Sequence, residues 1–193
     1  STENSVIVIS SVYKKFINYL KIQGGVFLDN SEKKILQKKL WDKNFILNRD
    51  LIAKESSKIA METGFDMNKY SKSKFLMVKE KNVGQKYFYS MEKLSPILTI
   101  YKVKNFNQAL LLAERILKNQ GQGHSCSIHS KNKNNILKVG NELPVSRVIV
   151  NQIHSFATGG SFDNGLPFSL SMGCGTWGKN IFDDNLNYKH FLN

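Results

Sequence analysis

The sequence lacks the features that mark membrane, secreted and disulfide-rich proteins. No apolar run approaches the roughly 18 residues that a membrane span needs, and the N-terminus lacks the basic-then-apolar order of a signal peptide. Only two cysteines occur, Cys126 and Cys174, and neither needs a disulfide. We therefore expect a protein of a reducing compartment, the cytoplasm, with no membrane partner.

Arginine is scarce although the chain is strongly basic, with a formal net charge of +13. Such a charge favours a nucleic-acid partner. However, only Arg49, Arg115 and Arg147 are arginines among 28 Lys and Arg residues, and recognition of bases and phosphates favours the bidentate arginine fork. The lysines also accompany twenty asparagines, which is typical of compositional bias. We expect a solvated lysine-rich surface that attracts anionic ligands, without nucleic acid; a lysine-rich nucleic-acid-binding module is the alternative.

Metal-binding and cysteine-nucleophile patterns are also missing. None of the four histidines lies in an HExxH motif or at a zinc-like spacing from a cysteine, so no metal site is expected. Cys126 and Cys174 lie among apolar or glycine neighbours without a nearby cation to favour a thiolate. His124 is the candidate that remains, because Gly121 to Gly123 carry it from a helix end to a strand start. A loop histidine bonded to backbone is the alternative interpretation.

A glycine cluster from Gly173 to Gly178 spells GxGxxG after a strand-like segment, residues 168–172. A dinucleotide fingerprint also needs a following helix, another strand and an acidic residue about 20 positions on. The chain ends first. We therefore favour a structural turn that packs Trp177.

Helices alternate with short apolar strands along the 193 residues, of which 41% are apolar. This pattern predicts one α/β domain, a three-layer αβα structure with a mostly parallel sheet covered on both faces. The expected strands cover residues 5–9, 74–78, 96–101, 126–129 and 145–150. Helices are expected to begin at Ser10 or Ser11, Asn30 or Ser31, Asn48, Asn105 and Lys133. Ligands gather at the carboxyl ends of the strands in such sheets, so we expect the site in the segments after Ile100, before Cys126 and after Val150.

The first three helices each present a set of apolar residues at helical spacing. The residues expected to face inward are Val12, Phe16, Tyr19 and Leu20, then Ile35, Leu36 and Leu40, then Leu51, Ile52, Ile59 and Ala60. Glycines end the first and third of these helices, at Gly24 and Gly64.

Glu92 stands at the entrance to the strand 96–101, where a carboxylate can accept two ribose hydroxyls; a solvated surface glutamate looks the same in sequence.

Four segments in register resemble the catalytic domain of the CoA-acylating aldehyde dehydrogenases. They are Glu92-Lys93-Leu94-Ser95-Pro96-Ile97-Leu98, Gly121-Gln122-Gly123-His124-Ser125, Leu143-Pro144-Val145-Ser146-Arg147 and Met172-Gly173-Cys174-Gly175-Thr176-Trp177-Gly178. Their order and spacing agree along nearly the whole chain. The resemblance implies that residues 1–193 form one catalytic domain that starts just after the nucleophilic cysteine, without the N-terminal Rossmann domain. Such a fragment is expected to be inactive, and the full-length protein to be a homo-oligomer.

The resemblance also implies a chemistry and a set of site residues. A cysteine thiolate adds to a small aldehyde, hydride passes to NAD or NADP, and the thiol of coenzyme A cleaves the thioester. Glu92 would hold the nicotinamide ribose, His124 would help to deprotonate CoA, and the amide of Ser1 would stabilise the oxyanion.

Neutral donors of one loop would border the substrate, which suits an anionic tail such as that of sulfoacetaldehyde. The loop residues are Thr158, Gly159, Gly160 and Ser161, with Asn164 and Ser169 beyond them. A catalytically silent paralogue with the same fold is a further alternative.

Overall fold

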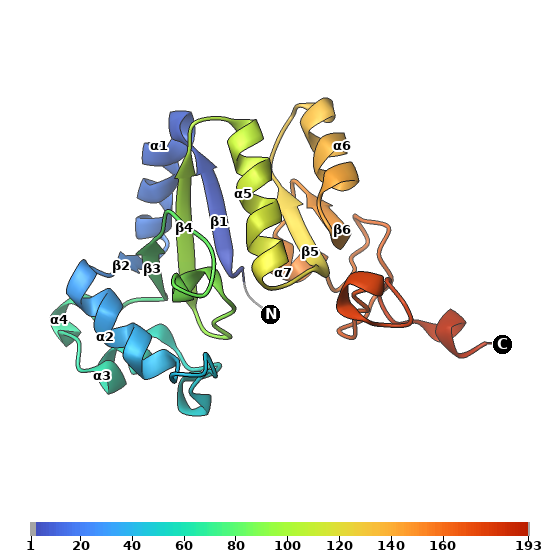
Figure 1. The fold of residues 1–193 in the computed structure, drawn as a ribbon. Helices are drawn as coiled ribbons and strands as arrows, with labels where there is room; N and C mark the ends of the chain where they lie inside the picture. The colour runs from blue at the N-terminus through green and yellow to red at the C-terminus, as the bar shows by residue number, and fades with distance from the viewer. Residues whose placement is uncertain (1–2, 193) are drawn as a thin grey trace. The chain divides into compact units, whose positions relative to one another are not determined.

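Two compact units make up the chain, Ser1–Ala109 and Leu110–Asn193 (Figure 1). The computed structural model describes residues 3–192. Unit 1 contains a four-stranded sheet in the order β1-β4-β3-β2, and unit 2 contains a two-stranded sheet, β5-β6. All four strand pairings are parallel. The predicted α/β class with parallel strands is thus confirmed, but the strands are divided between two sheets.

The sheet of unit 1 is formed by strands that the sequence largely predicts. Its strands are β1 (Ser5–Ile9), β2 (Gly25–Phe27), β3 (Phe75–Lys79) and β4 (Ile97–Val103). Strand β4 lies between β1 and β3, with Thr99 opposite Ser5 and Ile97 opposite Leu76. Only the three-residue β2 was not predicted. It follows the helix-ending Gly24 directly, and so short a strand leaves no recognisable alternation.

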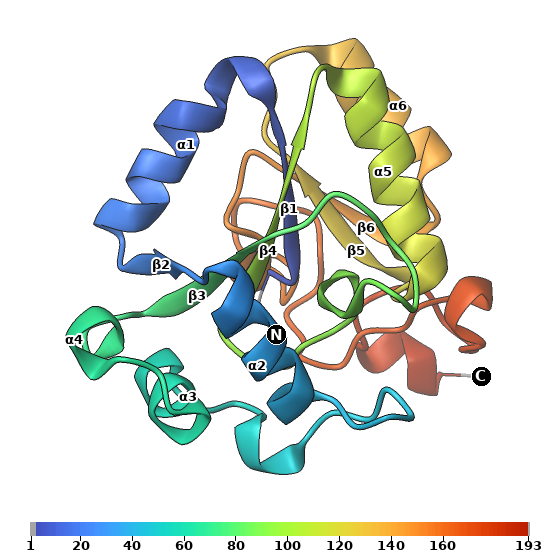
Figure 2. The same cartoon turned by 60° about the vertical axis from the view of Figure 1, so that its left-hand side comes forward.

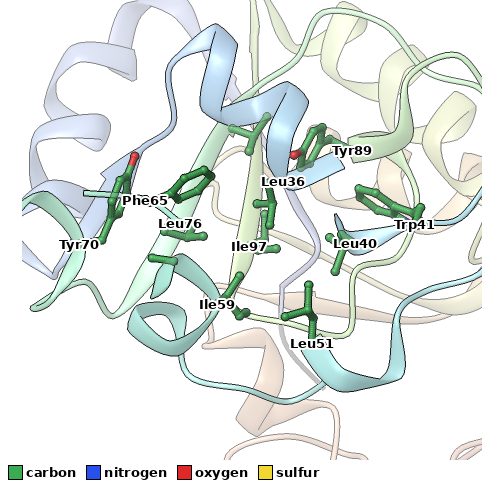
Figure 3. Packing of buried hydrophobic residues seen from close by; sticks show 12 residues of the cluster. Leu36, Leu40, Trp41, Leu51, Ile59, Phe65, Tyr70, Leu76, Tyr89 and Ile97 are labelled. Carbon is green, nitrogen blue, oxygen red and sulfur yellow. The ribbon is translucent and has the colours of Figure 1, made fainter. Parts of the chain in front are cut away.

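Helices cover both faces of this sheet, giving the three layers expected from the sequence. Helix α1 (Ser10–Ile22) packs on the face that carries Met77 and Ile100. Helices α2 (Asn30–Leu40) and α3 (Ser56–Thr63) pack on the face that carries Leu76 and Ile97 (Figure 3). Figure 2 shows α1 on one side of β2 and β3, and α3 with the short α4 (Met67–Tyr70) on the other.

The inward faces of α1 and α2 differ in part from the prediction. Val12 and Tyr19 are 54% and 55% exposed, and Tyr13 and Ile17 contact the core in their place. The sequence of α1 contains two overlapping stripes that share Phe16 and Leu20, and periodicity alone does not choose between them. In α2, Leu36 and Leu40 are buried as predicted but Ile35 is exposed.

The third predicted helix is broken in two. Asn48 caps a short 3-10 helix, Arg49–Leu51, by accepting a hydrogen bond from the amide of Asp50. Ala53 then takes a positive φ of 57°, which no helix contains, and α3 starts only at Ser56. Gly64 ends α3 in the left-handed conformation, as predicted.

Unit 2 combines a small βαβ arrangement with a long, mostly irregular segment, residues 158–192. Helix α5 (Phe106–Asn119) starts in unit 1 and continues into unit 2; β5 (Gly123–Ile128), α6 (Lys133–Glu142), β6 (Val145–Val150) and α7 (His154–Ala157) follow. The strand predicted at residues 168–172 is absent: Met172 forms only an isolated antiparallel bridge with Asn185, and Leu170 is 92% exposed.

Within residues 3–192, no helix has the length and apolar character to cross a membrane.

Candidate active site

Glu92 lies exposed on the loop between a short 3-10 helix, Phe88–Ser90, and the start of β4. The next residue, Lys93, is only 1% exposed. Its Nζ donates hydrogen bonds to the carbonyl oxygens of Tyr89 and Met91, each at 3.0 Å. Burial lowers the pKa of Lys93 to about 7, and the nearby Glu92 carboxylate opposes this shift. The loop therefore turns its lysine inward and its carboxylate outward.

The Glu92 loop is also attached to the start of β1. The Asn4 side-chain amide donates to the Met91 carbonyl over 3.2 Å, and the Thr99 hydroxyl donates to the Tyr89 carbonyl over 2.6 Å. The structure thus brings Glu92 and the beginning of the first strand together in unit 1, at the amino end of the sheet. Ser1, whose amide we expected at the oxyanion, lies outside the described residues.

His124 is the second residue of β5, directly after the glycine-containing turn that the sequence indicated. Its Nδ1 lies 2.6 Å from the hydroxyl oxygen of Ser125. The same hydroxyl lies 2.8 Å from Nε2 of His154, the first residue of α7. All three side chains are half-buried. The ring of His124 therefore contacts a side-chain hydroxyl, whereas the alternative interpretation expected a bond to the backbone.

A buried arginine supports the strand start that carries His124. Arg147 on β6 is 3% exposed and donates from Nη1 to the His124 carbonyl at 3.0 Å. Its Nε donates to Oδ1 of Asn185 at 2.7 Å, and its Nη2 donates to the carbonyls of Gly173 and Asp184. Burial lowers the pKa of Arg147, while electrostatic interactions with Cys174, Asp184 and Asp183 act in the opposite direction. The guanidinium remains charged and connects β5 and β6 to the irregular segment.

Asn185 extends this network to the loop expected to border the substrate. The side chain of Asn185 is fully buried and donates to the carbonyls of Thr158 and Pro167, at 2.8 and 2.9 Å. Thr158 is itself 1% exposed, and its hydroxyl donates to the His154 carbonyl at 3.0 Å. The hydroxyl of Thr158 thus has a partner within α7, and its contact with substrate stays a prediction.

The other predicted substrate donors divide into two groups. The amide of Gly160 donates to the Ala157 carbonyl at 3.1 Å, and its contact with substrate likewise stays a prediction. The Ser161 hydroxyl accepts a hydrogen bond from the amide of Asp163 at 3.2 Å and keeps its own proton to donate. Gly159 is half-buried beside Ser169 and Leu170. Ser161 and Gly159 stay predicted substrate contacts.

The glycine cluster near the C-terminus acts as a structural turn. A Cβ on Gly123, which has φ +81°, would collide with the carbonyl oxygen of Cys174, and a Cβ on Gly173 would collide with the carbonyl oxygen of Phe182. These glycines let the irregular segment approach β5 closely. A 3-10 helix, Thr176–Gly178, follows. The expected packing of Trp177 is wrong, because this side chain is 48% exposed.

Both cysteines are free thiols. Burial raises the pKa of Cys126 to about 12, so this side chain stays protonated at neutral pH, as its apolar neighbours predicted. Cys174 interacts electrostatically with Arg147, and the expectation that it lacks a cationic neighbour is wrong. Among residues 3–192, no three His, Cys, Asp or Glu side chains gather in a way that could hold a metal ion.

Sequence reasoning missed Lys93, Arg147 and His154. For two of them a signal existed: Arg147 alternates in phase with the inward-facing Val145 and Ile149 of its strand. Lys93 precedes the buried Ser95 and Ile97 in the same two-residue period. His154 has no such signal, because its contact with Ser125 spans 29 residues.

Comparison with known proteins gives matches along the whole chain. No protein-family model matches it. The chain is 46% identical to the acylating sulfoacetaldehyde dehydrogenase of Cupriavidus necator and 40% identical to a sulfoacetaldehyde dehydrogenase of an Acholeplasma species, with 100% of the chain covered. It resembles the crystal structure of an acetylating aldehyde dehydrogenase from Geobacillus thermoglucosidasius, with a TM-score of 0.91 and 34% identity over 97% of the chain. The chain spans 39% to 41% of the length of these proteins.

Proposed function

The chain is homologous along its whole length to the acylating aldehyde dehydrogenases, and we propose on this basis that the natural protein containing it oxidises a small aldehyde to its acyl-CoA. The reaction proceeds through a thioester on a cysteine that directly precedes Ser1. The observation that carries the proposal is the 46% identity over all 193 residues to an acylating sulfoacetaldehyde dehydrogenase. The hydrogen bond from Asn4 to the Met91 carbonyl supports it, because the chain enters β1 beside the Glu92 loop.

NAD or NADP accepts the hydride when it is bound. The exposed carboxylate of Glu92 fits a ribose, because its two oxygens can each accept a hydrogen bond from a neighbouring hydroxyl. Its backbone is fixed on both sides, by the buried Lys93 and by the contact of Asn4 with Met91. The net charge of +13 attracts both the dinucleotide and coenzyme A, which are anionic. Glu92 therefore binds and orients the cofactor rather than exchanging protons.

His124 supplies the base for thioester cleavage. Ser125 occupies the Nδ1 side of the imidazole, so the proton of the CoA thiol is taken at Nε2. Arg147 fixes the carbonyl of His124 and thereby the position of the ring at the start of β5. The substrate is sulfoacetaldehyde, by analogy with both relatives; the loop that carries Gly159 and Ser161 borders its sulfonate, and the amide of Ser1 stabilises the oxyanion.

The proposal is tested by assaying the natural protein for reduction of NAD and of NADP in the presence of aldehyde and coenzyme A. We expect CoA-dependent reduction and formation of the acyl-CoA, fastest with sulfoacetaldehyde among sulfoacetaldehyde, acetaldehyde and succinate semialdehyde. No CoA-dependent reduction with any of the three aldehydes would overturn the proposed function. A preference for acetaldehyde or succinate semialdehyde would overturn only the substrate.

Glu92→Gln is expected to lower kcat/KM for the nicotinamide cofactor about tenfold, since hydrogen bonds to a charged acceptor are stronger than bonds to a neutral one by roughly 1–1.5 kcal/mol. Steady-state kinetics with varied cofactor measure this loss. Glu55→Gln, at another exposed glutamate of unit 1, is the matched control and should leave kcat/KM unchanged. Unchanged kinetics in the Glu92 variant would refute its role.

His124→Ala is expected to slow CoA-dependent thioester cleavage by about 10²-fold or more, because a positioned general base contributes that much to proton transfer. The burst of reduced cofactor, which precedes this step, should change far less. Rapid-mixing measurements separate the two phases. His129→Ala, at an exposed histidine just after β5, is the control. Equal loss in both phases would show that His124 is structural.

A further inference from the structure

His154 has no part in the roles assigned so far, yet it is joined to the candidate base. The Ser125 hydroxyl lies 2.6 Å from Nδ1 of His124 and 2.8 Å from Nε2 of His154. One oxygen thus contacts two imidazoles that come from β5 and α7. Arg147 holds the backbone of His124, and the Thr158 hydroxyl holds the carbonyl of His154. The backbone of each histidine is therefore held by a hydrogen bond from another side chain.

A serine hydroxyl carries a single proton, so it cannot donate to both rings at once. When it donates to Nε2 of His154, it accepts from a protonated Nδ1 of His124, and Nε2 of His124 then has the lone pair that a base needs. When it donates to His124, the neutral ring of His124 carries its proton on Nε2 and cannot act as a base. The protonation of His154 thus determines the tautomer of His124.

We infer that His154 is a positioning residue for His124 and, through Ser125, receives the proton that His124 takes from the thiol of coenzyme A. This inference rests on the proposed function. The S–H bond of the thiol breaks and a proton binds Nε2 of His124; the Nδ1 proton moves to the Ser125 oxygen, and the hydroxyl proton moves to Nε2 of His154. The products are a thiolate and a His154 imidazolium. The proton returns along the same path to the cysteine thiolate that the thiolate attack releases.

Repulsion between the two rings separates the binding of two protons to the relay of His124, Ser125 and His154. Arg147 on β6 brings a positive charge to the backbone of His124, and Asp183, Asp184 and Cys174 from the irregular segment interact with that arginine. Two imidazolium rings bonded to one oxygen would repel each other. The first proton to bind is therefore shared between the rings, and the second binds at a lower pH.

The first test is an NMR titration of the 193-residue chain, whose four histidines give a tractable set of ring signals. We expect the signals of His124 and His154 to follow the same two titration steps, since coupled groups share macroscopic pKa values. Ser125→Ala should give each ring a single, independent step. Ser127→Ala, at an exposed serine of the same strand, is the matched control and should leave the coupling intact. Independent titration in the unsubstituted chain would overturn the inference.

The second test is kinetic and uses the natural protein. His154→Gln is expected to slow CoA-dependent thioester cleavage about tenfold and to shift its pH profile, while the hydride burst is retained. The double variant with His124→Ala should be no slower than His124→Ala alone, because both residues act in one path. Additive losses would overturn the relay. Absence of CoA-dependent activity in the unsubstituted protein would overturn the proposed function, whereas independent titration in an active protein would overturn the relay alone.

Discussion

Arg147→Met is expected to lower the free energy of unfolding of unit 2 by about 3–5 kcal/mol, because four buried acceptors would each lose a hydrogen bond from a charged donor. Methionine fills a similar volume but donates no hydrogen bond. The Asn185 amide oxygen and three backbone carbonyls, those of His124, Gly173 and Asp184, would lose the donor that now satisfies them. Each such buried acceptor costs about 1–3 kcal/mol when it is left unpaired, although water entering the site can offset part of this.

The measurement is urea-induced unfolding followed by fluorescence. The two tryptophans, Trp41 and Trp177, belong to different units, so Trp41→Phe in the background leaves Trp177 as the reporter of unit 2. Arg49→Met, at an exposed arginine, is the matched control and should change stability by less than about 0.5 kcal/mol. Arg147→Lys should be intermediate, because an ammonium cannot reach all four acceptors. A loss below about 1 kcal/mol for Arg147→Met would contradict the role of this network.

Strands β1, β3, β4 and β6 followed from the sequence because apolar β-branched runs between turns have few other structures open to them. Strand β2 was not predicted, and β5 begins three residues before the predicted strand. The inward face of α1 did not follow from the sequence, because this helix contains two apolar stripes. The sheet, through Met77 and Ile100, selects the stripe with Tyr13 and Ile17. The division into two sheets was not predictable, because strand pairing is a long-range property. The positive φ of Ala53 gives no signal in the sequence, since no glycine or asparagine stands at that position.

The candidate site likewise contains residues that local motifs indicate and supporting residues that only the fold brings to them. Glu92 and His124 could be proposed because motifs place them beside a strand start, and the structure puts both there, each in its own unit. The supporting residues could not be proposed from local pattern. Asn185 reaches the Arg147 side chain across 38 residues and His154 reaches Ser125 across 29, and only the folded chain brings such partners together. The structure also gives the Thr158 hydroxyl a partner, the His154 carbonyl, that the sequence analysis did not indicate.

The stability of unit 1 is expected to rise between pH 7 and pH 9.5, and Lys93 is the cause. Burial lowers its pKa in the folded chain to about 7, below the usual value of 10.5 that applies when the chain is unfolded. Between these two values the unfolded state binds more protons than the folded state, so the free energy of unfolding increases with pH, by up to about 1.4 kcal/mol per unit. The neutral amine still donates to Tyr89 and Met91, so the fold keeps both hydrogen bonds.

Lys93→Met should abolish this rise, because it removes the titrating group. Urea unfolding at several pH values measures the difference between the two chains, which should grow by about 3 kcal/mol from pH 7 to pH 9.5. Tyr70 and Tyr89, whose pKa values are raised mainly by burial, would lower stability only above pH 10, and they are present in both chains. Lys58→Met, at an exposed lysine of α3, is the control and should keep the rise. Parallel pH profiles for the unsubstituted and Lys93→Met chains would show that Lys93 remains charged in the folded protein and that its ammonium, not a neutral amine, holds the Glu92 loop.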